Sequence, residues 1–224
     1  MNNLEKDYRL FARDHRVSGT MIDGYNKMLN AYISPTITEE RKLNVAQMDV
    51  FSRLFMDRIL FLGTGIDSDV ANIITSQLLY LQMDNPNKAI NLYINSGGGS
   101  VYDGMSIYDV MKSNECPVST TCCGMAASMA AVLLSSGDKG LRQSLPHSRI
   151  MLHQPSGGAQ GQASDIYIAA REMEKCQDML YKVLADNMGK DYDYVKQICD
   201  RDYWLMPDEA INEGVIDTII QLKK

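Results

Sequence analysis

One serine of this sequence has the surroundings that are typical of a catalytic nucleophile. Ser128 lies among small residues in the run 124–131, which reads GMAASMAA. The apolar and β-branched run 118–123 precedes it, and a helix-forming run, 130–134, follows it. A strand, a tight turn and a helix together expose a nucleophile, and the N–H groups at the helix start would face a developing oxyanion. Small residues that only pack a helix against a sheet would give the same pattern.

A serine needs a base to become a nucleophile, and the sequence contains three histidines. His15 lies in a polar N-terminal stretch, and His147 lies in a predicted turn. His153 ends the apolar run 149–153, which we predict to be a strand, and a glycine-rich loop follows it. Because the carboxyl ends of parallel strands meet at one edge of a sheet, His153 is expected beside Ser128. A histidine that only caps a strand is the structural alternative.

A catalytic histidine is oriented by a carboxylate, and several acids lie downstream of it. The candidates are Asp191, Asp193, Asp200 and Asp202, and spacing alone does not separate the last two. Glycines 97–99 follow a predicted strand, as they would in an oxyanion hole or a phosphate loop. A plain turn uses the same residues.

Composition excludes several classes of protein. The chain has 224 residues, a net charge of −6 and no cluster of lysine or arginine, which argues against nucleic-acid binding. It has no apolar run of membrane-spanning length and no signal-peptide core, so a cytoplasmic protein is expected. The five cysteines form no Cys-x-x-Cys pair, so neither a disulfide framework nor a zinc site is predicted. No Walker A loop or Gly-x-Gly-x-x-Gly run is present, and no cofactor is expected.

The chain alternates between helix-like and strand-like segments from residue 49 onward. The polar stretch 1–34 is predicted to be an N-terminal extension or a processed leader, and 35–224 to be one domain. We predict strands over 58–63, 90–94, 118–123, 149–153 and 215–220, and helices over 50–56, 68–83, 102–111, 130–134, 163–188, 192–199 and from 207 to 214. Such alternation predicts an α/β fold with a parallel or mixed sheet covered by helices.

Three motifs occur in an order that resembles a known family. They are NSGGG at 95–99, GMAASM at 124–129 and MLHQP at 151–155. Together they resemble ClpP, the proteolytic subunit of the ATP-dependent Clp protease. Further agreement in 49–54, 58–62, 157–163, 201–202 and 209–217 extends the resemblance over roughly residues 35–220.

The resemblance implies a role for each candidate residue. Ser128 matches the nucleophile, His153 the general base and Asp202 the orienting acid, so the resemblance selects Asp202 over Asp200. The implied reaction is the cleavage of peptide bonds by a cytoplasmic serine endopeptidase. The oxyanion hole is implied to use the backbone N–H groups of Gly99 and Met129, with Gly98 beside them.

The resemblance also implies a fold and partners. The fold would be built of repeated β-β-α units, ClpP/crotonase-like, with residues 163–188 as a protruding handle helix. Through this helix two heptameric rings would stack into a barrel, with Asp200 and Arg201 as a ring-contact ion pair. An AAA+ unfoldase such as ClpX or ClpA would use ATP, which this chain would not bind, and would feed in unfolded polypeptide. The leader, 1–34, would be removed by self-cleavage.

Two departures from the family pattern motivate an alternative. Gly97 replaces the usual proline before the oxyanion glycines, and Ser113-Asn114 replaces aromatic or aliphatic residues near the implied unfoldase cleft, where Tyr93 is retained. A catalytically impaired subunit that serves as a structural partner in mixed rings would fit these departures. An acyl-CoA enzyme of the crotonase type is a second alternative, but such enzymes do not need a serine, histidine and aspartate set.

Overall fold

The computed structural model describes residues 36–41 and 44–223, and the chain falls into two units, Met1–Met56 and Asp57–Lys224. In the first unit, β1 (Thr36–Arg41) pairs antiparallel with β2 (Asn44–Asp49), and α3 (Val50–Met56) follows. The predicted extension, 1–34, lies outside the described residues.

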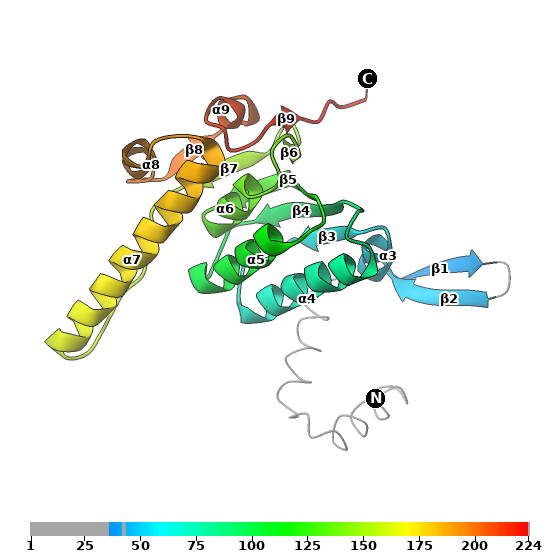
Figure 1. Ribbon diagram of the computed structural model, residues 1–224, viewed down its shortest axis with the longest axis horizontal. Coiled ribbons are helices and arrows are strands. Elements are labelled where there is room, and N and C mark those ends of the chain that lie inside the picture. The colour runs from blue at the N-terminus through cyan, green and yellow to red at the C-terminus, as the bar shows by residue number, and fades with distance from the viewer. Residues whose placement is uncertain (1–35, 42–43, 224) are drawn as a thin grey trace, which may run out of the picture. The chain divides into compact units, whose positions relative to one another are not determined.

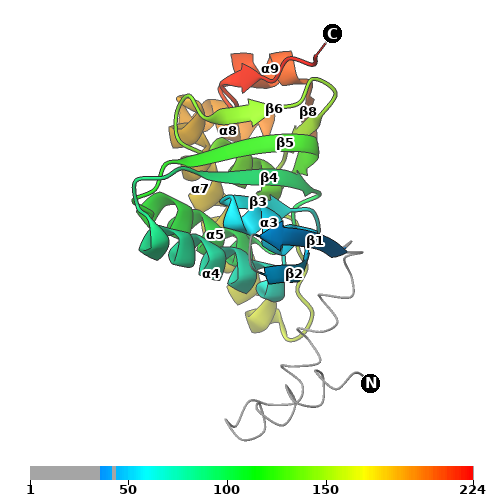
Figure 2. The same ribbon diagram turned by 90° about the vertical axis from the view of Figure 1, so that its right-hand side faces the viewer.

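The second unit is built on a sheet whose strands are mostly parallel (Figure 2). Its order is β3 (Ile59–Leu62), β4 (Ile90–Ser96), β5 (Val118–Ala127), β6 (Arg142–Ser144) and β9 (Thr218–Ile219). The long strand β5 has two successive neighbours, because its first half pairs with β6 and its second half with β7 (Arg149–Leu152). The short strand β8 (Tyr203–Leu205) is antiparallel to β7, which makes the sheet mixed as expected.

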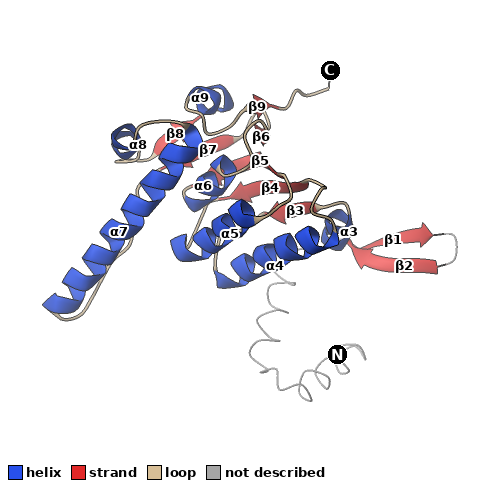
Figure 3. Ribbon diagram, viewed as in Figure 1, coloured by secondary structure: helices blue, strands red, loops and turns tan. Residues whose placement is uncertain are grey.

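Three helices connect the parallel strands and lie along one face of the sheet (Figures 1 and 3). They are α4 (Ser68–Asp84), α5 (Val101–Ser113) and α6 (Met129–Ser135). The hydrophobic core lies between this layer and the sheet, where the side chains of Leu78, Leu92, Ile94, Ile107 and Leu133 are fully buried. Burial of this apolar surface is the main force that holds the helices on the sheet.

The helix α7 (Ala163–Met188) has 26 residues and extends well beyond the sheet (Figure 1). Its buried side chains all lie in the C-terminal third, from Leu180 to Met188. The exposed N-terminal part carries Tyr167 and Ile168. The helix ends where Gly189 adopts a left-handed conformation, and α8 (Tyr192–Ile198) and α9 (Pro207–Asn212) complete the unit. The expected α/β fold with a protruding helix is confirmed.

Most predicted elements are confirmed, and the differences have local causes. The strand predicted to end at residue 123 continues to Ala127, because residues 125–127 pair with β7. The last strand is limited to Thr218–Ile219, and the short strands β6 and β8 were not predicted. Within the described residues, no helix combines the length and the apolar character that crossing a membrane requires.

Candidate active site

Ser128 lies at the turn where β5 ends and α6 begins, as the sequence predicts. Its φ of 56° is unusual for a residue other than glycine, so the turn is strained. A hydrogen bond of 2.9 Å from its backbone N–H to the carbonyl of Met151 holds this conformation. Ala126 and Ala127 are buried before it, which explains the small side chains at these two positions.

Strand register brings three loops to the carboxyl edge of the sheet. Ser96, the last residue of β4, pairs with Ala126, and Ala127 pairs with Met151 of β7. The glycines after β4, the Ser128 turn after β5 and the residue after β7 therefore lie side by side. This is the arrangement expected for parallel strands.

The glycine loop after β4 touches the serine turn directly. Gly98 has a φ of 91°, and a Cβ atom there would lie 2.6 Å from the carbonyl oxygen of Ala127 and 2.8 Å from Cβ of Ser128. Both values are shorter than real Cβ contacts, so a side chain at this position would displace the nucleophile. Gly98 is required for steric reasons, and its own N–H donates to the hydroxyl of Ser96 over 3.1 Å.

Two backbone N–H groups near Ser128 remain available. The N–H of Ile66 donates to the carbonyl of Gly98, and the N–H of Ser100 donates to the carbonyl of Ile66. Ile66 is therefore bonded to the residues before and after Gly99. In this parallel pairing the N–H of Gly99 faces away from Ile66. The N–H of Met129 is in the first turn of α6 and has no partner within the helix. Neither N–H has an acceptor among the residues that the structure describes.

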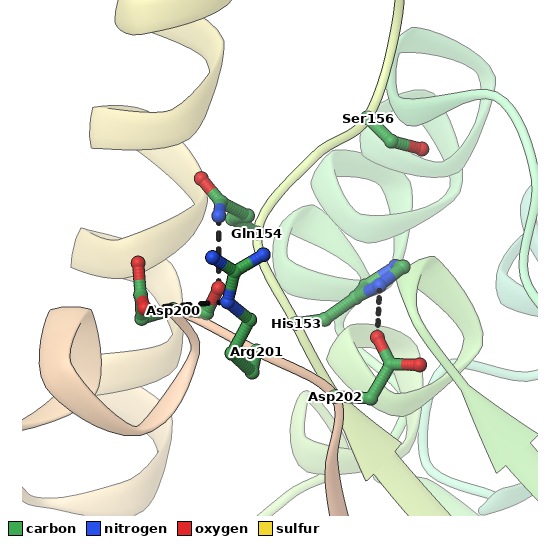
Figure 4. Close-up of a pocket in the computed structure, with 6 residues that line it drawn as sticks. All are labelled: His153, Gln154, Ser156, Asp200, Arg201 and Asp202. Carbon is green, nitrogen blue, oxygen red and sulfur yellow. Dashed lines mark hydrogen bonds and ion pairs between the residues drawn. The ribbon is translucent and has the colours of Figure 1, made fainter.

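His153 follows β7 immediately and contacts both Ser128 and Asp202. Its Nε2 lies 2.8 Å from Oγ of Ser128, and its Nδ1 lies 3.1 Å from Oδ1 of Asp202 (Figure 4 shows the second contact). In the neutral imidazole, Nδ1–H donates to the carboxylate and Nε2 accepts the serine proton. His147 lies before β7 in a turn, and His15 lies outside the described residues.

The antiparallel pairing of β7 and β8 determines which aspartate lies next to His153. Leu152 pairs with Tyr203, and the next step of the same register sets His153 opposite Asp202. Asp200 lies elsewhere in the loop, with its carboxylate 3.7 Å from Nε of Arg201. Asp191 and Asp193 belong to the start of α8.

Burial makes the neighbouring cysteines poor competitors for the role of nucleophile. Burial raises the pKa of the Cys122 thiol to about 11 and that of Cys199 to about 12. Both thiols are therefore protonated at neutral pH, and a thiol is a much weaker nucleophile than a thiolate. All five cysteines are free.

An open cavity of about 500 Å³ adjoins His153 and Asp202 (Figure 4). The residues that line it are all of polar or charged type: His153, Gln154, Ser156, Asp200, Arg201 and Asp202. Asp200 and Arg201 are exposed and pair with each other, and an exposed pair of this kind contributes little stability. No group of three histidine, cysteine or acidic side chains that could hold a metal ion occurs in the described part of the chain.

Comparison with known proteins links this geometry to a family. The family model described as Clp protease matches residues 41–223. The "ATP-dependent Clp protease proteolytic subunit" of Porphyromonas gingivalis is 53% identical over 96% of this chain and 97% of its own length. The subunit of the same name from Bacteroides fragilis (strain YCH46) is 54% identical over 96% and 98%. Subunit 1 of Salinibacter ruber is 46% identical over 83% and 80%.

Proposed function

Because the chain belongs to the Clp protease family, we propose that it is the proteolytic subunit of an ATP-dependent Clp protease, a serine endopeptidase acting on unfolded polypeptides. The observation that carries this proposal is the chain of contacts from Ser128 through His153 to Asp202. An acyl-CoA enzyme of the crotonase type would not need such a relay.

The proposed reaction begins with attack of Ser128 Oγ on a peptide carbonyl. Nε2 of His153 takes the hydroxyl proton, and Asp202 stabilises the imidazolium through Nδ1–H. The carbonyl oxygen becomes an oxyanion that accepts hydrogen bonds from the N–H groups of Gly99 and Met129. These donors are fixed by the glycine loop and by the start of α6, so they need little reorganisation.

The intermediate then breaks down in two stages. His153 returns the proton to the leaving amine, the C–N bond breaks, and the acyl group remains on Ser128. Water then enters, gives a proton to His153 and attacks the ester. The second tetrahedral intermediate releases the acid product and restores the hydroxyl of Ser128.

Assembly and partners are further parts of the proposal. We propose two stacked heptameric rings joined through α7, with Asp200 and Arg201 at a ring contact, in the cytoplasm. The exposed apolar residues of α7 and the exposure of the Asp200 and Arg201 side chains support this role. The relatives are named ATP-dependent, and an AAA+ unfoldase such as ClpX or ClpA would use the ATP and supply the substrate. The leader, 1–34, would be removed by self-cleavage.

The two departures from the family pattern are compatible with an active subunit. A Cβ at Gly97 would meet only Cε of Met125, at 3.7 Å, so this position does not crowd the serine turn. The side chain of Asn114 donates to the carbonyl of Leu78 and accepts the N–H of Cys116. Asn114 therefore joins the end of α5 to α4, which is a structural role.

The test is Ser128→Ala, with Ser106→Ala of the exposed face of α5 as the matched control. We expect Ser128→Ala to lose peptide cleavage and fluorophosphonate labelling, since it removes the attacking oxygen, whereas the control keeps both. Native mass spectrometry should find the same assembly for all three proteins. Undiminished labelling of Ser128→Ala would contradict the proposal. Peptidase activity that requires a paralogous subunit would instead assign a structural role in mixed rings.

A further inference from the structure

Gln154 joins three parts of the second unit next to the proposed catalytic residues. It follows His153 directly, and its backbone N–H donates to the carbonyl of Cys199 over 2.7 Å. Its side-chain Nε2 donates to the carbonyl of Asp200 over 2.9 Å (Figure 4). Its Oε1 accepts a hydrogen bond of 2.8 Å from Nε2 of Gln177, which belongs to α7.

Asp202 depends on its backbone for its position. Its side chain is 63% exposed, so little packing holds the carboxylate. Downstream, Tyr203 is fixed by its pairing with Leu152. Upstream, the two hydrogen bonds from Gln154 hold the backbone at residues 199 and 200.

The amide of Gln154 is itself held at both ends. Its oxygen is bound by Gln177, which lies one turn before Tyr181 in α7. Tyr181 is buried, and burial raises its pKa to about 12, so the phenol stays neutral. The helix α7 is thus linked through Gln177 and Gln154 to the loop that carries Asp202.

We propose that Gln154 is a positioning residue that holds the 199–202 loop so that Asp202 meets Nδ1 of His153. This inference rests on the proposed catalytic roles of Ser128, His153 and Asp202. An amide suits the position, because the side chain donates to the carbonyl of Asp200 and accepts from Gln177. A carboxylate would keep the contact with Gln177 and would repel the carbonyl of Asp200.

Three variants separate the contacts. Gln154→Ala removes both side-chain bonds, Gln154→Glu removes only the donor to Asp200, and Gln177→Ala removes only the link to α7. The matched control is Gln197→Ala, an exposed glutamine of α8. With a fluorogenic peptide amide, we expect kcat to fall roughly tenfold to a hundredfold in both Gln154 variants, as for a small displacement of a catalytic group. KM should change less than about twofold, and Gln177→Ala should lose less kcat than either Gln154 variant.

A double-mutant cycle with Asp202→Asn distinguishes positioning from general damage. If Gln154 acts through Asp202, Gln154→Ala should lower both kcat and the rate of fluorophosphonate labelling in the wild-type protein. In a protein that already carries Asp202→Asn, adding Gln154→Ala should change both quantities by less than about twofold. Native mass spectrometry checks that each protein has the wild-type assembly. If Gln154→Ala does not assemble, Gln154→Glu takes its place in the cycle, because it keeps the size of the side chain.

Two results would overturn the inference, and a third concerns its premise. Wild-type kcat in both Gln154 variants would show that Gln154 does not position Asp202. An equal loss of kcat on Gln154→Ala in the wild-type protein and in Asp202→Asn would show the same. Wild-type activity of Asp202→Asn alone would instead overturn the proposed role of Asp202, and with it the premise of the inference.

Discussion

At the scale of single residues, the site depends on unusual backbone conformations at Ser128 and Gly98. Ser128 has a φ of 56° and is kept there by the bond from its N–H to Met151. Gly98, at a φ of 91°, fits against the serine turn only because it lacks a side chain. Strain of this kind persists where the surrounding structure determines it, and it often marks a functional site.

We expect Gly98→Ala to damage the site and Gly97→Ala to be tolerated. The first adds a Cβ 2.6 Å from the carbonyl oxygen of Ala127, whereas the second meets Met125 at an ordinary 3.7 Å. Gly98→Ala should destabilise the fold by about 1–3 kcal/mol and lower kcat at least roughly tenfold, because the serine turn must move. Gly97→Ala should change stability by less than about 1 kcal/mol. Urea denaturation and peptidase assays measure both, and equal behaviour of the two variants would contradict this view.

At the scale of elements, α7 is divided between an anchored and an exposed part. Leu180, Leu184 and Met188 pack against the rest of the unit, whereas Tyr167 and Ile168 face solvent. A long helix that lacks packing on its first turns opens locally at a low free-energy cost. The part that would contact another subunit is therefore the part least stabilised within one subunit.

We expect amide hydrogen exchange to reveal this division. In dissociated subunits, residues 163–179 should exchange faster than residues 180–188, because the fully buried side chains of the helix all lie in 180–188. Assembly should slow the exchange in 163–179, whereas α9, which serves as the internal comparison, should change little. Identical exchange of 163–179 in dissociated and assembled protein would argue against α7 as the ring contact.

At the scale of the whole second unit, Arg142 ties together segments that are distant in sequence. Its guanidinium is buried and donates to the carbonyls of Asn187 and Gly214 over 2.7 and 2.8 Å. Its Nε donates to the carboxylate of Asp217 over 2.9 Å. These bonds connect β6 with the end of α7 and with the segment that leads into β9.

We expect Asp217→Asn to destabilise the protein in a pH-dependent way. The hydrogen bonds from Arg142 hold the pKa of Asp217 below its ordinary value. The pKa of Asp217 is lower in the folded state than in the unfolded state, where it is about 3.9. The stabilisation is therefore complete when the pH is above the unfolded-state pKa, and it is lost as the pH falls through the folded-state pKa. At pH 7 the loss should be about 2–4 kcal/mol, less than for a fully buried pair because Asp217 keeps 19% exposure.

Urea denaturation at pH 7 and at about pH 3 measures this dependence. The difference in free energy of unfolding between wild type and Asp217→Asn should become smaller at the lower pH. The matched control is Asp208→Asn, an exposed position of α9, with an expected effect of a few tenths of a kcal/mol. A larger difference in free energy of unfolding at about pH 3 than at pH 7 would show that the Arg142–Asp217 pair does not stabilise the protein in this way.

The sequence by itself determined the local features of this protein. The helix of residues 163–188 follows from a long helical pattern with Gly189 after it, and the turn at Ser128 follows from small residues between a strand and a helix. Such features depend on neighbours in sequence, which set the backbone conformation directly. The family motifs added the roles of the residues, including the preference for Asp202.

Only the tertiary structure decided which distant residues meet. Spacing left Asp200 and Asp202 equivalent, and the register of β7 with β8 sets Asp202 opposite His153. β8 has three residues, too few for a periodic signal, and it exists because β7 offers it a partner. The link from Gln154 to α7 was also invisible in sequence. Contacts of this kind join segments tens of residues apart, and packing and strand register establish them.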